Sequence, residues 1–403
     1  MLTIQQLKEN YSKEQVLLVL LTRIYFATGR ETDAADFIAA NQINWIRLYR
    51  ITQAHGLRSF IYYVIKQHVI SVDPAFENRL KKSYAITRHQ NLRMGITTAK
   101  LISDFKAKDI VIIPYKGAVF AHSYYPDIAL RESADVDFLV AAEAVNEIEN
   151  YFIEKDYTPK TTVPKRYHNY YKRFFKDIVY RTPDGENAFS IEMHWKLMEA
   201  FSGDYPGHEY FLPHLQPYSL GGLAASKLTP TYDLLAVVSN HFVKDMAIKF
   251  KYLVDIASLI NKEDASIDKK VVFETASRYG FTKKLETGLA LTTDLLGISM
   301  TGRPVSKITS GRFLNVPLAF PVHLPRLYIN EPEFIKCSLQ LQDNNRRRFK
   351  FISNSVLYMF LPTYADINQL KLPAYTLPFL IIIRPLRLLY LSVRSKSKVK
   401  ASL

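Results

Sequence analysis

Apolar residues recur at helical spacing throughout the first quarter of the chain. The clearest set is Val16, Val19, Leu20 and Ile24. Neighbouring members lie three or four residues apart or adjacent, which places them on one face of a helix. A second amphipathic segment begins at Asn44-Trp45, and a long one covers residues 79–105. We therefore expect residues 1–108 to form a helical N-terminal region.

The pattern then changes to short β-branched and aromatic runs typical of strands. The elements we expect are a strand at 110–114, a helix at 118–125 after the break at Gly117, a strand at 135–140, a helix at 143–155, and strands at 174–181 and 188–197 joined by a turn at 182–185. The last two strands form a hairpin. Strands and helices in this order predict a mixed sheet with helices packed on it, which we assign to residues 109–225.

The rest of the chain is mainly helical. Residues 226–300 form the next helical region, in which Thr229-Pro230 is a helix start signal. Residues 301–403 are a proline-punctuated connection, a short helical segment and a basic tail. The fold class we predict is α+β, with a central mixed β-sheet core flanked by helical N-terminal and C-terminal regions.

The composition is that of an ordinary folded protein with an excess of positive charge. Of the 403 residues, 48% are hydrophobic and 13% aromatic, and the net charge is +15. This charge favours polyanionic partners, such as a nucleoside triphosphate, nucleic acid or an anionic membrane. A single cysteine, Cys337, excludes an intramolecular disulfide and a cysteine-built zinc site. No signal-peptide pattern is present at the N-terminus, so we expect a cytoplasmic protein.

The C-terminus is the most basic part of the chain. No acid follows Asp366. Residues 376–392 mix apolar side chains with arginines, but Pro378 and Pro385 interrupt a run that is too short to span a membrane. A solvated, frayed terminus is the simpler interpretation. The alternative is peripheral contact with an anionic membrane, at its inner face, through residues 376–403.

Candidate chemistry is concentrated at Asp135 and Asp137, where the central strand begins. Residues two apart on a strand project from the same face. Two carboxylates held together there favour a divalent cation between them. Glu192, on the return strand of the hairpin, is the third carboxylate. Three acids on neighbouring strands suit two Mg²⁺ or Mn²⁺ ions roughly 3.5–4 Å apart, an arrangement used for phosphoryl transfer.

Phosphate-binding groups precede the acidic pair. Lys116 and the backbone N–H groups after Gly117 are placed to hold phosphate oxygens at a helix N-terminus. Arg131 is suited to clamp a phosphate bidentately, and Ser133 to donate a hydrogen bond to one. These four residues are the candidate nucleotide-binding residues.

Each candidate also has a structural interpretation. The two aspartates could be a solvated strand start, Arg131 could pair with a nearby acid, and His194 could serve packing and positioning. His241 and Asp255 lie on predicted helices and could pair with each other, or they could line an acceptor pocket together with His194. The histidines form no H-x-x-x-H pair, which argues against a zinc site of that type.

Taken together, these motifs resemble a known family. The run Y-K-G-A, Y-P-D, L-R-E-S-A-D-V-D-F-L-V, followed by I-E-M-H-W at 191–195, is similar to the core of the uncharacterised nucleotidyltransferase family of the DNA polymerase beta superfamily. Asn240-His241, the segment 251–256, Trp45 and A-H-G-L at 54–57 extend the resemblance over roughly residues 40–297.

The resemblance implies metal-dependent transfer of a nucleoside monophosphate from a triphosphate to an acceptor: a small molecule, sugar, nucleic acid or protein. Two departures from the superfamily stand out. Lys116-Gly117-Ala118 replaces its glycine-serine turn, and Glu192 stands where aspartate is commoner. The cofactor implied is Mg²⁺ or Mn²⁺.

Two other functions compete with this one. A glycosyltransferase could use Asp-x-Asp to bind a nucleotide-sugar, but there the motif usually follows a hydrophobic strand. Here the apolar run 138–140 comes after it. The other is a non-catalytic nucleotide-binding or interaction protein on a degenerate scaffold, against which stands the retention of all three carboxylates.

Overall fold

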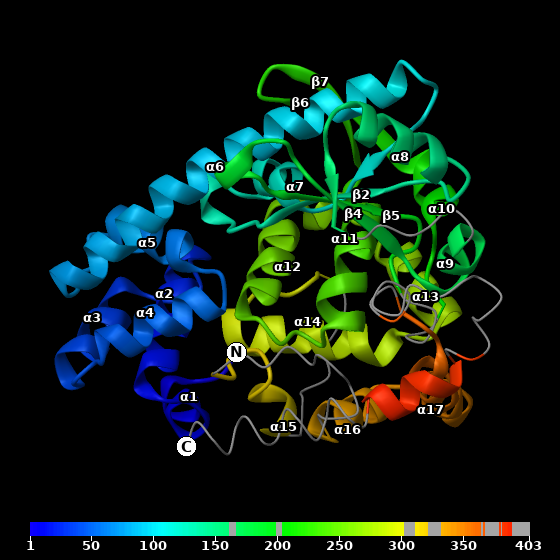
Figure 1. Cartoon of the computed structure of the whole chain (residues 1–403). Coiled ribbons are helices and arrows are strands. Elements are labelled where there is room, and N and C mark those ends of the chain that lie inside the picture. The colour runs from blue at the N-terminus through cyan, green and yellow to red at the C-terminus, as the bar shows by residue number, and fades with distance from the viewer. Residues whose placement is uncertain are drawn as a thin grey trace.

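The computed structural model describes residues 1–160, 167–198, 204–301, 311–320, 332–363, 366, 379 and 381–388. It has the α+β architecture predicted from the sequence (Figure 1). A five-stranded mixed sheet has the strand order β1-β2-β5-β4-β3. Its strands are β1 (Ile113–Pro114), β2 (Asp135–Leu139), β3 (Thr158–Pro159), β4 (Asp177–Arg181) and β5 (Ser190–His194). Among these described strands, only the β2–β5 pair is parallel.

The N-terminal region is helical, as expected. Its helices are α1 (Ile4–Asn10), α2 (Lys13–Tyr25), α3 (Glu31–Ala40), α4 (Trp45–Ala54), α5 (Arg58–Gln67) and α6 (Pro74–Lys106). Asp73 caps α6 by accepting a hydrogen bond from the Phe76 amide, and Pro74 fits the first turn, where an N–H would lack a partner. α6 then continues from the N-terminal helices to the sheet region (Figure 1).

Shorter helices connect the strands, and a longer set follows them. Those around the sheet are α7 (Gly117–Tyr124), α8 (Val145–Glu154), α9 (His168–Phe174) and α10 (His208–Phe211). Those that follow are α11 (Pro230–Val238), α12 (Phe250–Glu263), α13 (Lys269–Tyr279), α14 (Thr282–Leu296), α15 (Gly311–Leu314), α16 (Pro332–Gln340) and α17 (Asn345–Phe360). Gly280 and Gly297 end α13 and α14 in the left-handed conformation that favours glycine.

Two large hydrophobic cores hold most of these elements together. The larger core joins the N-terminal helices to α11–α14, through residues such as Leu17, Phe60 and Leu253. The second core lies between the sheet, α6 and α8, and contains Phe105, Phe138 and Phe152. Because α6 contributes to both cores, it connects the sheet to the helical part of the molecule.

The structure differs from the expected strands in several places, and strand β3 (Thr158–Pro159) was not predicted. The strand predicted at 110–114 is limited to Ile113–Pro114. The strand predicted to begin at 174 begins at Asp177, because residues His168–Phe174 complete helix α9. A second sheet, formed by β6 (Leu215–Leu220) and β7 (Leu223–Leu228), was not anticipated. Gly221 and Gly222 form its turn with positive φ angles, which glycine adopts without strain.

The C-terminal predictions are only partly open to comparison. Much of the proline-punctuated connection and most of the basic tail lie outside the described residues. Within the described part of the chain, no helix combines the length and apolarity needed to cross a membrane.

Candidate functional site

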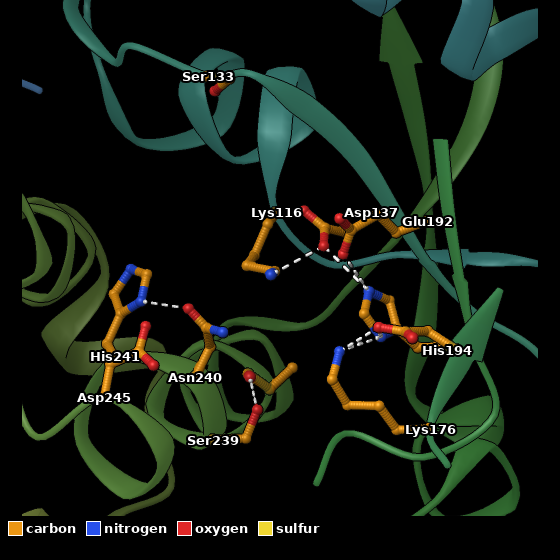
Figure 2. A network of polar contacts seen from close by, with 12 residues as sticks. Lys116, Ser133, Asp137, Lys176, Glu192, His194, Ser239, Asn240, His241 and Asp245 are labelled. Atoms are coloured by element: carbon orange, nitrogen blue, oxygen red, sulfur yellow. Dashed lines mark hydrogen bonds and ion pairs between the residues drawn. The ribbon is translucent and has the colours of Figure 1, made fainter. Parts of the chain in front are cut away.

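Two carboxylates face each other at the centre of the sheet. The parallel register of β2 and β5 sets Asp137 directly opposite Glu192. Directly paired residues project from the same face of a sheet, so both carboxylates enter the same space (Figure 2). Asp137 is buried, whereas the Glu192 side chain keeps 26% of its surface exposed. The hairpin predicted from the sequence thus brings the third carboxylate beside the Asp-x-Asp strand.

Two basic side chains contact Asp137. Lys116 Nζ lies 2.8 Å from its Oδ1, and His194 Nε2 lies 3.1 Å from the same atom (Figure 2). Burial acts to raise the pKa of Asp137, but Lys116 and His194 outweigh it and hold the pKa well below its usual range. Asp137 is therefore ionised at neutral pH.

Gly117 lies where α7 begins, close to the backbone of β2. Its φ angle is +63°, in the left-handed region that favours glycine. A Cβ at this position would lie 3.2 Å from the backbone oxygen of Asp135, tighter than most such contacts. The glycine predicted as a phosphate-binding turn therefore also lets α7 begin close against β2.

Asp135 occupies the first position of β2, opposite Ser190. Being two residues from Asp137, it projects from the same face of the strand. Burial and the nearby negative charge of Asp137 raise the pKa of Asp135. The two aspartates therefore repel each other, and a cation between them would relieve that repulsion. Asp135 is not part of the close group of possible ligand atoms, which consists of Asp137, Glu192 and His194.

Arg131 belongs to a buried network. Its Nε donates to Asp255 Oδ1 at 3.0 Å, and its Nη1 donates to Ser133 Oγ at 2.8 Å. Asp255 also accepts a hydrogen bond from Tyr125 and faces His241 Nε2 at 2.8 Å. Burial lowers the pKa of His241 to about 4, so its imidazole is neutral at pH 7. The pairing of His241 with Asp255 predicted from the sequence is present. Because Asp255 lies on α12, its contact with Arg131 connects Arg131 to that helix.

These groups surround a cavity of about 410 Å³. It is lined by Lys116, Arg131, Ser133, Ala134, Asp135, Asp137, Glu192, Asn240, His241, Lys244, Asp245, Lys249, Lys251 and Tyr252. Asp135, Asp137 and Glu192 come from β2 and β5. The segment 244–251 contributes Lys244, Lys249 and Lys251 together with Asp245. Gly117, His194 and Asp255 are not part of the lining but contact residues that are.

Lys251 is one of these cavity lysines. Its Nζ donates to the backbone oxygen of Glu132 at 3.0 Å. Burial, followed by the positive charge of Arg131, lowers the pKa of Lys251 to about 8. An anion in the cavity would favour its charged form. Lys251 belongs to the motif at 251–256, but its role was not predicted because its distance from the sheet depends on tertiary packing.

A π-helix presents several cavity residues. It covers Ser239–Lys244, directly after α11, and carries Asn240, His241 and Lys244. Lys284 on α14 donates to the backbone oxygen of Val243 at 2.9 Å and so holds its C-terminal end. Short π-helices occur often at functional sites. The apolar spacing predicted ordinary helices here, since one wider turn barely changes that spacing.

A second pair of charged residues lies behind His194. Asp177 is paired opposite His194 across β4 and β5, and its Oδ2 lies 3.4 Å from His194 Nδ1. Lys176 contacts the Asp177 carboxylate, and it also contacts His194 (Figure 2). Burial acts to raise the pKa of Asp177, but Lys176 and His194 outweigh it and lower the pKa. Sequence reasoning missed this pair because their proximity to the site follows from strand register.

The uncharacterised nucleotidyltransferase family matches residues 41–297, more than half of the chain. The chain belongs to this family. Its mixed sheet with the Asp-x-Asp strand is consistent with the place of the family in the DNA polymerase beta superfamily. No curated protein and no solved structure matches the chain. Family membership and the Asp–Glu–His group support a nucleotidyltransferase-like activity, and hence a nucleotide substrate.

The residues around Asp137 fit a divalent cation. Asp137, Glu192 and His194 each offer one ligand atom, and these atoms lie within 4.8 Å of one another. Carboxylate oxygens suit Mg²⁺ and Mn²⁺, and imidazole nitrogen is a common ligand of transition metals. The family usually implies such an ion, and this donor set could hold one.

Proposed function

We propose that this protein is a metal-dependent nucleotidyltransferase that transfers a nucleoside monophosphate from a nucleoside triphosphate to an acceptor and releases pyrophosphate. The observation that carries the proposal is the cavity, which is lined both by the acids Asp137 and Glu192, paired opposite one another, and by several lysines. Acids alone would repel a triphosphate. Lysines alone could bind a triphosphate, but the acids beside them would then have no role. Their combination fits a triphosphate with divalent cations.

The proposed ligands are Asp135, Asp137 and Glu192, with Mg²⁺ or Mn²⁺ as the ion. When bound, such ions lower the pKa of an attacking hydroxyl and neutralise the leaving pyrophosphate. The ionised state of Asp137 supports this assignment, because a ligand must be deprotonated. Asp135 shares a face of β2 with Asp137, and a nearby cation would lower the pKa that burial and the charge of Asp137 raise.

The lysines are the proposed phosphate-binding residues. Lys251 and Lys249 approach the cavity from the start of α12, and Lys244 approaches from the π-helix. Lys116 stands beside Asp137, where it can hold a phosphate oxygen next to the carboxylates. Arg131 is committed to Asp255 and Ser133, so we assign it a weaker direct contact with phosphate than the lysines. Gly117 would act through the backbone at the start of α7.

The acceptor side is the least defined. His241 and Asp255 face each other, and a neutral His241 lines the cavity. We propose that this pair shapes the acceptor pocket. The mixture of charged and polar groups in the lining suits a polar acceptor that carries a nucleophilic hydroxyl or amine.

The test is incubation with each α-labelled triphosphate, Mn²⁺ or Mg²⁺ and a cell extract as the source of acceptor. We expect Asp137→Asn and Glu192→Gln to lower label transfer and pyrophosphate release at least about 100-fold. The matched control is Glu186→Gln, an exposed acid in the turn of the same hairpin, which should keep full activity. Equal labelling by all variants would rule out the proposed site.

Two other outcomes identify the competing functions. Triphosphate binding without metal dependence or turnover, measured by calorimetry, would indicate a non-catalytic binding protein. Transfer of labelled sugar from a nucleotide-sugar, without transfer from triphosphates, would indicate a glycosyltransferase. The order of elements disfavours the latter, because Asp135 and Asp137 open β2 and do not follow it.

We also propose that α17 contacts an anionic membrane surface. This helix has no buried residue, and its apolar side chains form one exposed stripe. The stripe consists of Phe349, Ile352, Val356, Leu357 and Phe360. Arginines 346–348 and Lys350 flank its start. An apolar stripe beside cationic side chains is the pattern of a helix lying in a membrane interface, whereas a second copy would bring like charges together.

Vesicle co-sedimentation tests this contact. We expect Phe349→Glu with Val356→Glu to abolish binding to phosphatidylglycerol vesicles, and wild type not to bind phosphatidylcholine vesicles. The control is Ile46→Glu, an exposed apolar residue of α4, which should bind as wild type does. Unchanged sedimentation of the double variant would remove α17 from the proposal. Residues 376–403, predicted from the sequence for this contact, lie mostly outside the described residues.

A further inference from the structure

His194 projects toward the acids although the sequence favoured packing and positioning. On β5 the buried apolar side chains Ile191 and Met193 lie on one face, and Glu192 and His194 lie on the other. His194 Nε2 is 3.1 Å from Asp137 Oδ1 and 3.2 Å from Glu192 Oε2. One ring nitrogen therefore faces two carboxylates from different strands.

These separations match those of donor atoms that share an ion. Two atoms bound side by side to a cation at about 2.1 Å lie roughly 3 Å apart. Both separations from His194 Nε2 have this length, and the three ligand atoms lie within 4.8 Å of one another. A histidine that only filled space would not need its nitrogen equidistant from two carboxylate oxygens.

The opposite nitrogen of the ring has a carboxylate partner of its own. His194 Nδ1 faces Asp177 Oδ2 at 3.4 Å, and Asp177 is held in turn by Lys176. A metal-binding histidine commonly donates its second N–H to a carboxylate, which fixes the ring and leaves the other nitrogen free to coordinate. Asp177 is in position to do this, and strand pairing keeps it directly opposite His194.

We propose that His194 Nε2 is a metal ligand beside Asp137 and Glu192, oriented by Asp177, and that the site consequently prefers Mn²⁺ to Mg²⁺. The inference rests on the proposed function for the presence of a metal site. The preference follows from the donor set, because Mg²⁺ favours oxygen ligands alone while imidazole suits the first-row transition metals.

The competing arrangement is a hydrogen bond. If Lys176 donates to Nδ1, at the observed 3.3 Å, the proton lies on Nε2 and is donated to Asp137. His194 would then be a positioning residue for a carboxylate, with no bond to the ion. The two arrangements differ in whether nitrogen is bonded to the metal, which can be measured directly.

The experiment uses the full chain with Mn²⁺ alone. Electron spin echo spectroscopy of the bound Mn²⁺ should show coupling to a directly bonded nitrogen, and His194→Gln should lose that coupling. Titration followed by the signal of free Mn²⁺ should show affinity lowered about 10- to 100-fold in His194→Gln and about tenfold in Asp177→Asn. His89→Gln, an exposed histidine of α6, is the control and should bind as wild type does.

Mg²⁺ competition against bound Mn²⁺ measures the preference. In His194→Gln, the ratio of Mn²⁺ affinity to Mg²⁺ affinity should fall toward the ratio of a site built from oxygen ligands alone. Bound Mn²⁺ without nitrogen coupling in wild type would overturn the proposal, and this result needs no variant to fold. Nitrogen coupling without nucleotidyl transfer would support the ligand and reject the proposed function. Nucleotidyl transfer by the wild type, together with unchanged Mn²⁺ binding in His194→Gln, would support the proposed function and reject His194 as a ligand.

Discussion

Asp137 on β2 and Glu192 on β5 are directly opposite each other in the single parallel strand pair of the described sheet. The alignment fixes two carboxylates, which are 55 positions apart in the chain, by backbone hydrogen bonds. It also places His194 within reach of both. Lys116 neutralises part of this charge from the loop before α7. The geometry of the site is therefore a consequence of strand register.

Replacing Lys116 by methionine should change two affinities in opposite directions. Its ammonium group lies 2.8 Å from Asp137 and partly offsets the charge that attracts a cation. We expect Lys116→Met to bind Mn²⁺ more tightly and to bind a triphosphate about tenfold more weakly, as for one lost charge-assisted hydrogen bond. Calorimetry with each ligand separately measures both. Lys108→Met, at an exposed site, is the control; a parallel fall of both affinities would contradict the prediction.

Gly117→Ala should destabilise the protein more than Gly185→Ala. Both glycines have φ near +60°, so alanine is strained at either position by about 1–2 kcal/mol. Only at Gly117 would the new Cβ meet a neighbour, the Asp135 backbone oxygen at 3.2 Å; nothing lies within 4 Å at Gly185. The difference between their free energies of unfolding in urea isolates this contact. Equal losses of unfolding free energy in the two variants would show that α7 can move away from β2 without an energetic cost.

The sequence sufficed for the fold class, the Asp-x-Asp strand and the hairpin that carries Glu192, since each has a local signal. Alternating apolar residues and the turn at 182–185 indicate the hairpin. Strand register has no such signal, so the contact of His194 with Asp137 and the pairing of Asp177 opposite His194 were not predictable. Lys249 and Lys251 follow the Asp-x-Asp strand by more than 100 residues. They reach the cavity only because α12 packs beside it.

Two further features of the fold could not be predicted from local sequence patterns. The β6–β7 hairpin was missed although Gly221-Gly222 is a recognisable turn signal, because its strands lack a clear apolar alternation. The π-helix at Ser239–Lys244 cannot be told from an α-helix by apolar spacing over so few residues. Both features depend on what packs against them.

Asp255→Asn should destabilise the protein by about 3–5 kcal/mol at neutral pH, because it leaves buried Arg131 without its charge partner. Burial acts to raise the pKa of Asp255, but Arg131 and His241 outweigh it and lower the pKa below that of the unfolded chain. The carboxylate thus stabilises the fold above about pH 4 and loses that contribution as the pH falls further.

The difference between wild type and Asp255→Asn should therefore shrink as the pH is lowered from 7 to 3. Urea unfolding at several pH values measures it. The exposed Glu274→Gln, also in the C-terminal helices, should differ from wild type by no more than about 0.5 kcal/mol. A difference that stayed constant with pH would show that the charge of Asp255 contributes nothing.

Asp233 should show the opposite dependence on pH. Burial raises its pKa to about 7, above the value of about 4 in the unfolded chain. The fold is thus favoured while this group is protonated, and stability is lost as the pH rises through 7. Asp233→Asn keeps an oxygen that can accept the hydrogen bond from Tyr124. We expect this variant to be more stable than wild type at pH 8 but not at pH 4.5, when both are unfolded in urea.

Gly288→Ala should disturb the π-helix from the outside. Gly288 lies one turn beyond Lys284 on α14, and a Cβ there would lie 2.2 Å from the Phe242 ring, which belongs to the π-helix. The ring must move, so we expect a loss of about 1–3 kcal/mol in unfolding free energy, typical of overpacking. Triphosphate affinity should fall with it, because Phe242 adjoins His241 in the cavity wall.

Gly95→Ala in α6 is the matched control. It too replaces a helical glycine, but the nearest atoms to its Cβ would be 3.8 Å away, an ordinary contact. Because alanine favours helix over glycine by about 1 kcal/mol, this change should stabilise the protein and leave triphosphate affinity unchanged. Opposite signs for the two substitutions would show that α14 sets the position of the π-helix. If Gly288→Ala lowers stability but not triphosphate affinity, the π-helix residues do not contribute to phosphate binding.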